Sequence, residues 1–360
     1  MLKKGLFLFG LVLISLLLLV ACGTSDETNS SDSDSDSNSE TTPASEQEQE
    51  EQSEESEQAE ESDTYTIGAS QIVEHPSLDA AYKGFQEAID DAGLEVEYDY
   101  QSAQNDVNNA STIAKNFVSD SVDLIFANST PSAQGALAAT DDIPIIFTSV
   151  TDAVEGGLVE SMDQPGENIT GVLDLHPESI ENTVSFIDTY FEEATVGLIY
   201  NSGEANSVAQ IEAVNAAIEG TSLNTEERTV ATSADVQQAA TTLVGDADVI
   251  YVITDNTVVD ALEAVVGVSN DQDIPLIVGE PDSVRKGGFA TYGIDYHTIG
   301  YRAGEMAVEV LTGEKTTSDI PVEIPPEMQL FINKDAAEDQ GVEWNEDWDE
   351  EAQFLETETE

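Results

Sequence analysis

The chain has 360 residues, of which 74 are Asp or Glu and 10 are Lys or Arg, so its formal net charge at pH 7 is −64. A surface this acidic repels nucleic-acid phosphates and anionic lipid headgroups, which excludes nucleic acid as a partner and disfavours binding to a membrane surface. We interpret the acidity as adaptation of an exported protein to high salt rather than as cation capture, because no Asp-x-Asp-x-Asp-Gly calcium loop occurs after residue 63.

The first 22 residues have the order of a secretory signal peptide. Lys3 and Lys4 precede an apolar run over residues 5–20, and small residues then lead to Cys22. The run is short for a membrane-spanning helix. Because Cys22 is the only cysteine, we predict that it is the lipidation site of a lipoprotein. Its two acyl chains would anchor the protein at the extracytoplasmic face of the cell membrane.

Residues 23–63 consist almost entirely of Ser, Asp, Glu, Gln and Thr. Such a segment cannot bury enough apolar surface to offset the entropy of ordering its chain. We predict a disordered acidic tether that holds the following domain away from the membrane.

From residue 65 onward, short aliphatic runs alternate with helical patterns, which predicts parallel sheets covered by helices. The first series comprises strands at residues 65–69, 95–98, 124–127 and 144–148, and helices at residues 76–92, 106–118 and 131–139. The second comprises strands at residues 195–200, 224–230, 249–253, 275–278 and 288–292, and helices at residues 207–218, 234–244 and 257–270.

These two series predict an α/β protein with two Rossmann-like lobes. The chain passes between them at residues 166–175 and 293–296, and again after a helix at residues 298–311, where residues 320–324 are extended. Three connecting segments make a hinge. We expect a first lobe of residues 64–172 with 294–318, a second lobe of residues 173–293 with 319–345, and an acidic tail at residues 346–360.

Candidate binding residues lie where strands lead into helices, because ligands of open parallel sheets bind at the carboxyl ends of the strands. Polar residues are concentrated in turns at residues 70–76, 128–132, 148–152, 201–207 and 254–257, with two further segments at residues 279–281 and 295–296. A single Ser, Thr, Asn or Asp in such a turn usually caps the next helix. Three to five polar groups in one turn exceed what a cap needs, so they predict a polar cleft between the lobes.

From these turns we select sixteen candidate ligand-binding residues. They are Gln71, Glu74, His75, Ser129, Thr130, Thr151, Asp152, Ser202, Glu204, Asn206, Ser207, Asp255, Asn256, Glu280, Asp295 and Tyr296.

The residue types in these turns suit a zwitterion. Hydroxyl and N–H groups at Ser129, Thr130 and residues 149–151 suit a carboxylate, whereas Asp255, Glu280 or Asp295 suits an ammonium group. Tyr296 offers apolar contact to a side chain. The sequence therefore predicts an amino acid as the ligand, bound without a cofactor or metal.

An enzyme is disfavoured because the local patterns of known catalytic sites are missing from the sequence. There is no Gly-x-Ser-x-Gly elbow, no phosphate-binding Gly-x-x-x-x-Gly-Lys loop, no Gly-x-Gly-x-x-Gly and no His-Glu-x-x-His. His75 beside Glu74 could form an acid–base pair, but a helix cap with a ligand contact is the simpler interpretation.

Several blocks of sequence, in order, resemble the TrpX-type substrate-binding family of ABC transporters. They are QIVEHPSLDA at residues 71–80, TPSAQ at 130–134, VTDAV at 150–154, PGENITG at 165–171, YNSGEANS at 200–207 and TDNTV at 254–258. The resemblance implies a type I periplasmic-binding-protein fold, closure of two lobes on a ligand, and import through a separate permease and its ATPase. Some members of this family are regarded as receptors for aromatic amino acids, so we expect a ligand of this kind. We also expect a monomeric receptor.

Two alternatives remain open at this point. A sugar or nucleoside would also fit a polar cleft, although the only tryptophans, Trp344 and Trp348, lie far from the polar turns in sequence. A membrane-tethered sensor that presents its ligand to a signalling protein would share the same fold.

Overall fold

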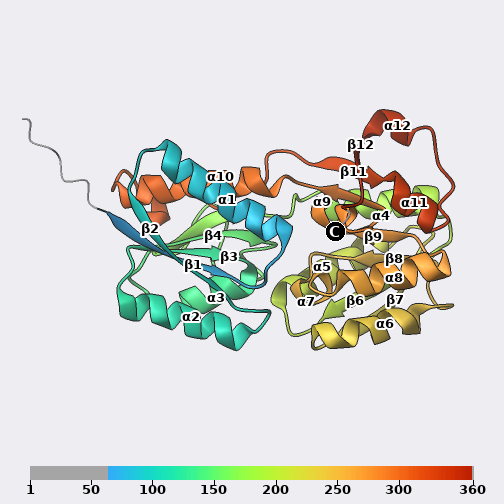
Figure 1. Ribbon diagram of the computed structural model, residues 1–360, viewed down its shortest axis with the longest axis horizontal. Helices are drawn as coiled ribbons and strands as arrows, with labels where there is room; N and C mark the ends of the chain where they lie inside the picture. Colours follow the sequence, from blue (N-terminus) through green and yellow to red (C-terminus); the bar gives the residue numbers. More distant parts are fainter. Residues whose placement is uncertain (1–63, 359–360) are drawn as a thin grey trace, which may run out of the picture. The chain divides into compact units, whose positions relative to one another are not determined.

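The computed structural model describes residues 64–358, and Figure 1 shows the course of this part of the chain. The described residues form one compact unit. The predicted signal peptide, Cys22 and the whole predicted tether lie outside the described residues. Two separate sheets organise the unit, as the two series of strands in the sequence predict.

The first sheet is entirely parallel and has the order β2-β1-β3-β4-β5. Its strands are β1 (Tyr65–Gln71), β2 (Val96–Ser102), β3 (Leu124–Asn128), β4 (Ile145–Val150) and β5 (Ile169–Leu173). Helices α1 (Pro76–Asp91) and α10 (Tyr296–Leu311) cover one face, and α2 (Val107–Asp120) and α3 (Thr130–Leu137) cover the other (Figure 1).

Helices α1 and α10 touch each other through glycine. A Cβ atom at Gly300 would collide with the carbonyl of Ala81, and one at Gly84 would collide with the carbonyl of His297. The missing side chains let the two backbones approach closely, so a segment more than 200 residues later in the chain becomes part of the first lobe.

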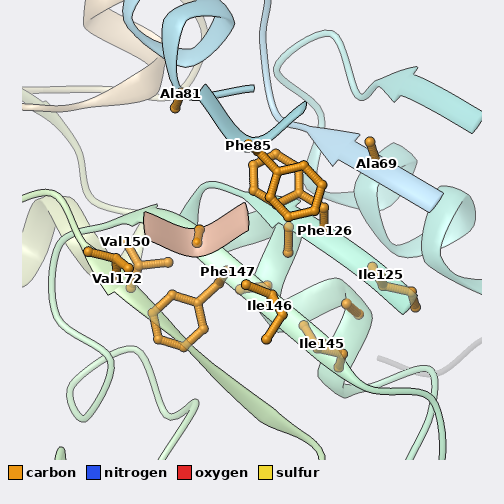
Figure 2. Close-up of a cluster of buried hydrophobic side chains, with 14 of the residues drawn as sticks. Ala69, Ala81, Phe85, Ile125, Phe126, Ile145, Ile146, Phe147, Val150 and Val172 are labelled. Atoms are coloured by element: carbon orange, nitrogen blue, oxygen red, sulfur yellow. The ribbon is translucent and has the colours of Figure 1, made fainter. Parts of the chain in front are cut away.

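The core of the first lobe lies between this sheet and its helices. Figure 2 shows its side chains, including the rings of Phe85 and Phe126, which stack with their centroids 4.0 Å apart. Every residue of β3 and β4 is buried. This is the pattern of a parallel strand covered on both faces, and it explains why these strands read as continuous apolar runs.

The second sheet has the order β12-β11-β10-β9-β8-β6-β7, and only the β10–β11 pair is antiparallel. Its strands are β6 (Thr195–Asn201), β7 (Asn224–Val230), β8 (Val249–Val252), β9 (Leu276–Val278), β10 (Ala290–Gly293), β11 (Gln329–Asn333) and β12 (Ala352–Leu355). Its helices are α4 (Ser179–Tyr190), α5 (Ala205–Ile218), α6 (Val236–Leu243), α7 (Asn256–Val259), α8 (Leu262–Gln272), α9 (Pro281–Arg285), α11 (Lys334–Asp339) and α12 (Trp348–Glu351).

Two hydrophobic clusters cover the two faces of this sheet. Val249 and Tyr251 of β8 belong to one cluster, and the intervening Ile250 with Val252 belongs to the other. Alternate residues of a strand point to opposite faces, so the second sheet is also a central layer.

The chain crosses between the lobes three times. The first crossing follows β5 at residues 174–178, the second lies between β10 and α10 at residues 294–295, and the third leads to β11. Residues before the third crossing stay with the first lobe, because Ile320 and Val322 belong to its core and Glu323 bridges to Val172. The third crossing therefore begins after residue 323 rather than at residue 319.

Several predicted elements differ from those in the structure. Residues 169–173, expected to connect the lobes, form β5, and the helix expected at residues 257–270 is divided into α7 and α8. The helix expected at residues 234–244 begins with a 3₁₀ turn at Ser233–Asp235. Residues 346–360, set apart as a tail, contribute α12 and β12 to the second lobe, where β12 pairs with β11.

Candidate ligand-binding site

A cavity of about 40 Å³ lies between the two lobes at the carboxyl ends of their strands. It is built by the turn after β1, the end of β4, the first crossing, the turns after β6 and β8, and the first residues of α9 and α10. Its lining residues are Val73, His75, Ser77, Leu78, Ser149, Thr151, Asp174, Asn206, Thr254, Asp255, Asn256, Val259, Glu280 and Tyr296.

Three polar atoms around this cavity are buried without a hydrogen-bond partner among the described residues. They are Nε2 of His75, Oδ1 of Asp174 and Oδ1 of Asn206. A buried polar atom without a partner costs free energy, and such atoms are rare in folded proteins. Their convergence on one cavity marks it as a place where a polar ligand supplies the missing hydrogen bonds.

His75 presents a hydrogen-bond donor to the cavity. Its Nδ1 accepts from the Ser77 N–H at 3.3 Å, which leaves the proton of the neutral ring on Nε2. Burial lowers the pKa of His75 to about 4, and the charge of Lys286 acts in the same direction, so the ring is neutral at neutral pH. Nε2 lies 3.8 Å from Glu280 Oε1, which is too far for a hydrogen bond.

Three carboxyl groups line the cavity, but only one has an unused oxygen. Both oxygens of Asp255 accept backbone N–H groups, from Asn201 at 2.6 Å and from Val258 at 2.8 Å. Both oxygens of Glu280 cap α9 by accepting from the N–H groups at its start. Asp174 accepts from the Tyr296 hydroxyl at 2.9 Å through Oδ2, and its Oδ1 is free to meet a ligand.

Burial also shifts the titration of the acidic groups. It raises the pKa of Asp174 to about 6, even though the Tyr296 hydrogen bond favours the ionised form. Burial raises the pKa of Asp255 to about 6 as well, and the negative charge of Glu204 adds to this rise. No Lys or Arg lines the cavity. A cationic group of a ligand therefore finds carboxylates here, whereas an anionic group finds only neutral donors.

The two lobes meet around the cavity through side-chain contacts. The Ser77 hydroxyl of α1 lies 2.5 Å from Glu280 Oε2 and 2.7 Å from Asp282 Oδ2, both of the second lobe. Gln210 also donates to the Thr151 hydroxyl at 3.4 Å. Because a cavity that holds benzene measures about 150 Å³, the lobes must separate before a molecule as large as an aromatic amino acid can enter.

The structure brings seven of the sixteen predicted residues to the cavity. They are His75, Thr151, Asn206, Asp255, Asn256, Glu280 and Tyr296. Three further lining residues, Val73, Ser149 and Thr254, belong to the polar turns that the sequence singles out.

The other nine predicted residues lie elsewhere. Gln71, Ser129, Thr130, Glu204 and Ser207 are buried outside the cavity lining, where Gln71 bonds with Asn128, Ser129 caps α3, and Glu204 accepts from Asn256 and Thr257. Glu74 and Ser202 are exposed, Asp152 accepts backbone N–H groups of its own loop, and Asp295 caps α10. Polar side chains after a strand can hydrogen-bond the backbone of their own turn instead of facing the cleft.

Four lining residues were missed by sequence reasoning: Ser77, Leu78, Asp174 and Val259. Asp174 carries a detectable signal, since it is the charged residue directly after a short apolar run at residues 169–173. Ser77, Leu78 and Val259 lie inside helices and carry no such signal.

A larger hollow of about 450 Å³ lies next to Tyr296, lined by α9, the start of α10 and the third crossing. None of the unpaired buried polar atoms belongs to a residue that lines it. We therefore place the candidate site in the smaller cavity. Within residues 64–358 there is no cluster of three or more His, Cys, Asp or Glu residues that could hold a metal ion.

Comparison with known proteins identifies the family. The family model described as "ABC transporter substrate binding protein" matches residues 66–354. The chain belongs to the family of ABC transporter substrate-binding proteins. A tyrosine-binding protein of Clostridioides difficile is 44% identical to this substrate-binding protein over 274 residues, covering 75% of this chain and 79% of the relative.

Two solved structures show the same fold. An ABC domain from Streptococcus pneumonia in complex with L-Trp is 32% identical, with a TM-score of 0.77 over 81% of this chain and 99% of that chain. The ligand-free, open structure of a substrate-binding protein with adhesive properties from Clostridium difficile is 38% identical, with a TM-score of 0.61 over 82% of this chain and all of that chain. The lobes here are thus arranged more like those of the L-Trp complex, although the open protein is closer in sequence.

These comparisons confirm the resemblance stated from the sequence and the type I periplasmic-binding-protein fold. The family and its relatives are binding proteins and not enzymes, as the sequence predicts. No helix among the described residues is long and apolar enough to cross a membrane.

Proposed function

We propose that the protein is the receptor of an ABC importer and that it binds an aromatic amino acid in the cavity between its lobes. The observation that carries this proposal is the set of unpaired buried atoms around the cavity. One is a neutral donor, at His75, and two are acceptors, at Asp174 and Asn206. A zwitterion supplies both an acceptor, in its carboxylate, and donors, in its ammonium group.

The relatives support an aromatic side chain. The C. difficile protein is named for tyrosine binding, and the S. pneumonia structure contains L-Trp. Val73, Leu78 and Val259 supply apolar surface beside the polar atoms. Binding requires the lobes to open and then to close by rotation about the three crossings, so that closure buries the ligand. No bond is made or broken.

The rest of the assignment follows from the family and the amino-terminal sequence. Family members work outside the cytoplasm and deliver their ligand to a separate permease with its ATPase. We assign lipidation to Cys22 and a tethering role to residues 23–63, which would hold a monomeric receptor near its permease. Mass spectrometry of the mature protein, which would show a diacylglyceryl group on the first residue, tests the anchor. A neighbouring histidine-kinase gene in place of permease and ATPase genes would favour a sensor.

Thermal unfolding of the mature chain, residues 23–360 with Cys22 removed, tests the ligand in concentrated salt. A ligand at a hundred times its dissociation constant adds about 2.7 kcal/mol to the free energy of unfolding. We expect a rise in Tm with L-tyrosine, L-tryptophan or L-phenylalanine. A rise in Tm only with sugars or nucleosides would overturn the assignment of an amino acid as the ligand. No rise in Tm with any amino acid would also contradict this assignment.

A further inference from the structure

Asp174 occupies a position in the molecule that no other cavity-lining carboxyl shares. It lies in the first crossing, directly after β5, and its Oδ2 accepts from the hydroxyl of Tyr296, which begins α10 just after the second crossing. The pair therefore joins two of the three segments that form the hinge. Only 8% of Asp174 is exposed.

The alternatives for binding a cation are already used by the protein. Asp255 and Glu280 have both of their oxygens bonded to backbone N–H groups, and Glu280 also meets the Ser77 hydroxyl. A ligand ammonium group could reach them only by sharing oxygens that already accept backbone N–H groups. Oδ1 of Asp174 lacks any hydrogen-bond partner among residues 64–358 and lies in the cavity wall.

The charge balance around Asp174 points the same way. Glu280 and Asp255 also line the cavity, no Lys or Arg does, and the His75 ring is neutral. An isolated carboxylate buried among other carboxylates is unfavourable unless a cation joins it. A structure that keeps such a group next to a cavity has a place for a positively charged ligand atom.

We propose that Asp174, oriented by the Tyr296 hydroxyl, is the residue that holds the ammonium group of the bound amino acid. This inference rests on the proposed function and deepens it. The opposite end of the ligand, the carboxylate, then meets the Nε2–H of His75 on the first lobe, and Asn206 Oδ1 of the second lobe accepts a further ammonium hydrogen. The ammonium contact is made on the hinge itself, so a ligand held there is placed between the two lobes before they close.

The test compares wild-type protein with Asp174→Asn, using aromatic ligands that carry the ammonium group and ligands that lack it. Asparagine keeps the shape of the side chain and an oxygen for Tyr296, but it loses the negative charge. The probes are L-tyrosine, tyramine, which lacks the carboxylate, and 3-(4-hydroxyphenyl)propionate, which lacks the ammonium group, together with L-tryptophan and 3-indolepropionate. Binding is measured by isothermal titration calorimetry on residues 23–360. Asp163→Asn, at an exposed position outside the site, changes the net charge equally and serves as the control.

We expect Asp174→Asn to weaken the binding of L-tyrosine or L-tryptophan at least about tenfold, since hydrogen bonds to charged groups are the strong ones. The affinity for tyramine should fall by a similar factor. The ligands without an ammonium group should bind the variant at least as well as they bind the wild type. Tyr296→Phe keeps the Asp174 carboxylate and removes only the hydrogen bond that orients it. This variant should bind the same amine ligands more weakly than the wild type does, but by a smaller factor than Asp174→Asn.

The two proposals fail in different ways. If wild-type protein binds L-tyrosine or L-tryptophan and Asp174→Asn binds it equally well, the assignment of Asp174 falls and the proposed function stands. An equal loss for ligands with and without the ammonium group would also overturn the assignment, because it would mark a general packing defect. If the wild type binds no amine ligand, both proposals fall.

Discussion

At the scale of single residues, Asp255 shows why position alone does not give a role. It lies beside the cavity as the sequence predicts, yet it is fully buried and its two oxygens hold the Asn201 and Val258 N–H groups. We expect Asp255→Ala to lower the free energy of unfolding of the ligand-free protein by about 2 kcal/mol or more, from a lost helix cap and an unsatisfied N–H. Chemical denaturation measures this loss, and Asp255→Asn, which keeps one acceptor oxygen, should lose less. If Asp255→Ala left the stability unchanged and abolished binding, Asp255 would be a ligand-binding residue rather than a structural one.

Asp174 should behave in the opposite way in the absence of ligand. Its pKa of about 6 in the folded protein exceeds the value of about 3.9 in an unfolded chain, so the folded state holds the proton more tightly. This group therefore favours folding below about pH 4 and loses that contribution as pH rises through about 6. Burial is the main cause of the shift, the hydrogen bond from Tyr296 opposes it, and the charge of Glu280 adds to it.

The measurement is the stability difference between Asp174→Asn and the wild type as a function of pH. We expect this difference to move in favour of the variant by about 1 kcal/mol between pH about 5.5 and about 7.5, because only the wild type must ionise a buried group. A difference that stays constant over this range would show that Asp174 has an ordinary pKa in the ligand-free protein.

The limits of prediction from sequence also lie at this scale. The rule that ligands bind at the carboxyl ends of parallel strands selected turns that line the cavity between the lobes, and His75, Asn206 and Tyr296 are among their lining residues. The rule could not show that the carboxylate oxygens of Asp255 and Glu280 accept backbone N–H groups, because these hydrogen bonds depend on the geometry of the turns. It passed over Asp174 because residues 166–175 read as a connection, whereas five of them form β5.

At the scale of elements, the contact between α1 and α9 stabilises the closed arrangement of the lobes. The Ser77 hydroxyl has one proton and lies within hydrogen-bond distance of both Glu280 and Asp282. Without that hydroxyl, these two neighbouring carboxyl groups of the second lobe lose the hydrogen-bond donor that the first lobe supplies. We expect Ser77→Ala to shift the ligand-free protein toward open forms, seen as a larger radius of gyration in small-angle X-ray scattering. Ser185→Ala, on the exposed face of α4, should leave the scattering unchanged, and an equal radius for both variants would remove this role from Ser77.

The carboxyl-terminal elements show where composition misleads. Residues 346–360 are rich in Asp and Glu and resemble a tail, yet Trp348 is only 1% exposed and packs against Phe186, Tyr190 and Phe289. The acidic residues around Trp348 face solvent, so its one buried ring packs the segment against the second lobe. Local composition could not reveal this, because Phe186, Tyr190 and Phe289 lie at least 59 residues away from Trp348 in the sequence.

We expect Trp348→Ala to lower the free energy of unfolding by about 3–5 kcal/mol, the usual loss for removing a buried aromatic ring. The matched control is Trp344→Ala, because Trp344 lies at the edge of the same cluster and is only partly buried. Denaturation followed by circular dichroism should therefore give a much smaller loss for Trp344→Ala. Equal losses would mean that the segment is held by its strand pairing rather than by the Trp348 ring.

At the scale of the whole molecule, charge dominates. Lys and Arg are outnumbered by Asp and Glu, 10 to 74, and Arg228 and Arg302 each contact more than one acidic partner. Such exposed ion pairs contribute about 0–1 kcal/mol each and weaken in salt. Repulsion among the excess carboxylates opposes the compact state, and salt weakens that repulsion as well, since the screening length falls to about 3 Å at 1 M.

Because repulsive pairs far outnumber attractive ones, screening should increase stability on balance. We expect the Tm of residues 23–360 to rise steadily as sodium chloride increases at neutral pH, where a protein held by its ion pairs would lose stability. Potassium chloride at equal concentration provides the control. Equal rises in Tm with both salts would indicate screening. A rise in Tm with only one cation would indicate a specific binding site and would support the interpretation of the acidic surface as a site of cation capture. A Tm that falls with either salt would show that the few ion pairs outweigh the repulsion, and it would contradict adaptation to high salt as the reason for this composition.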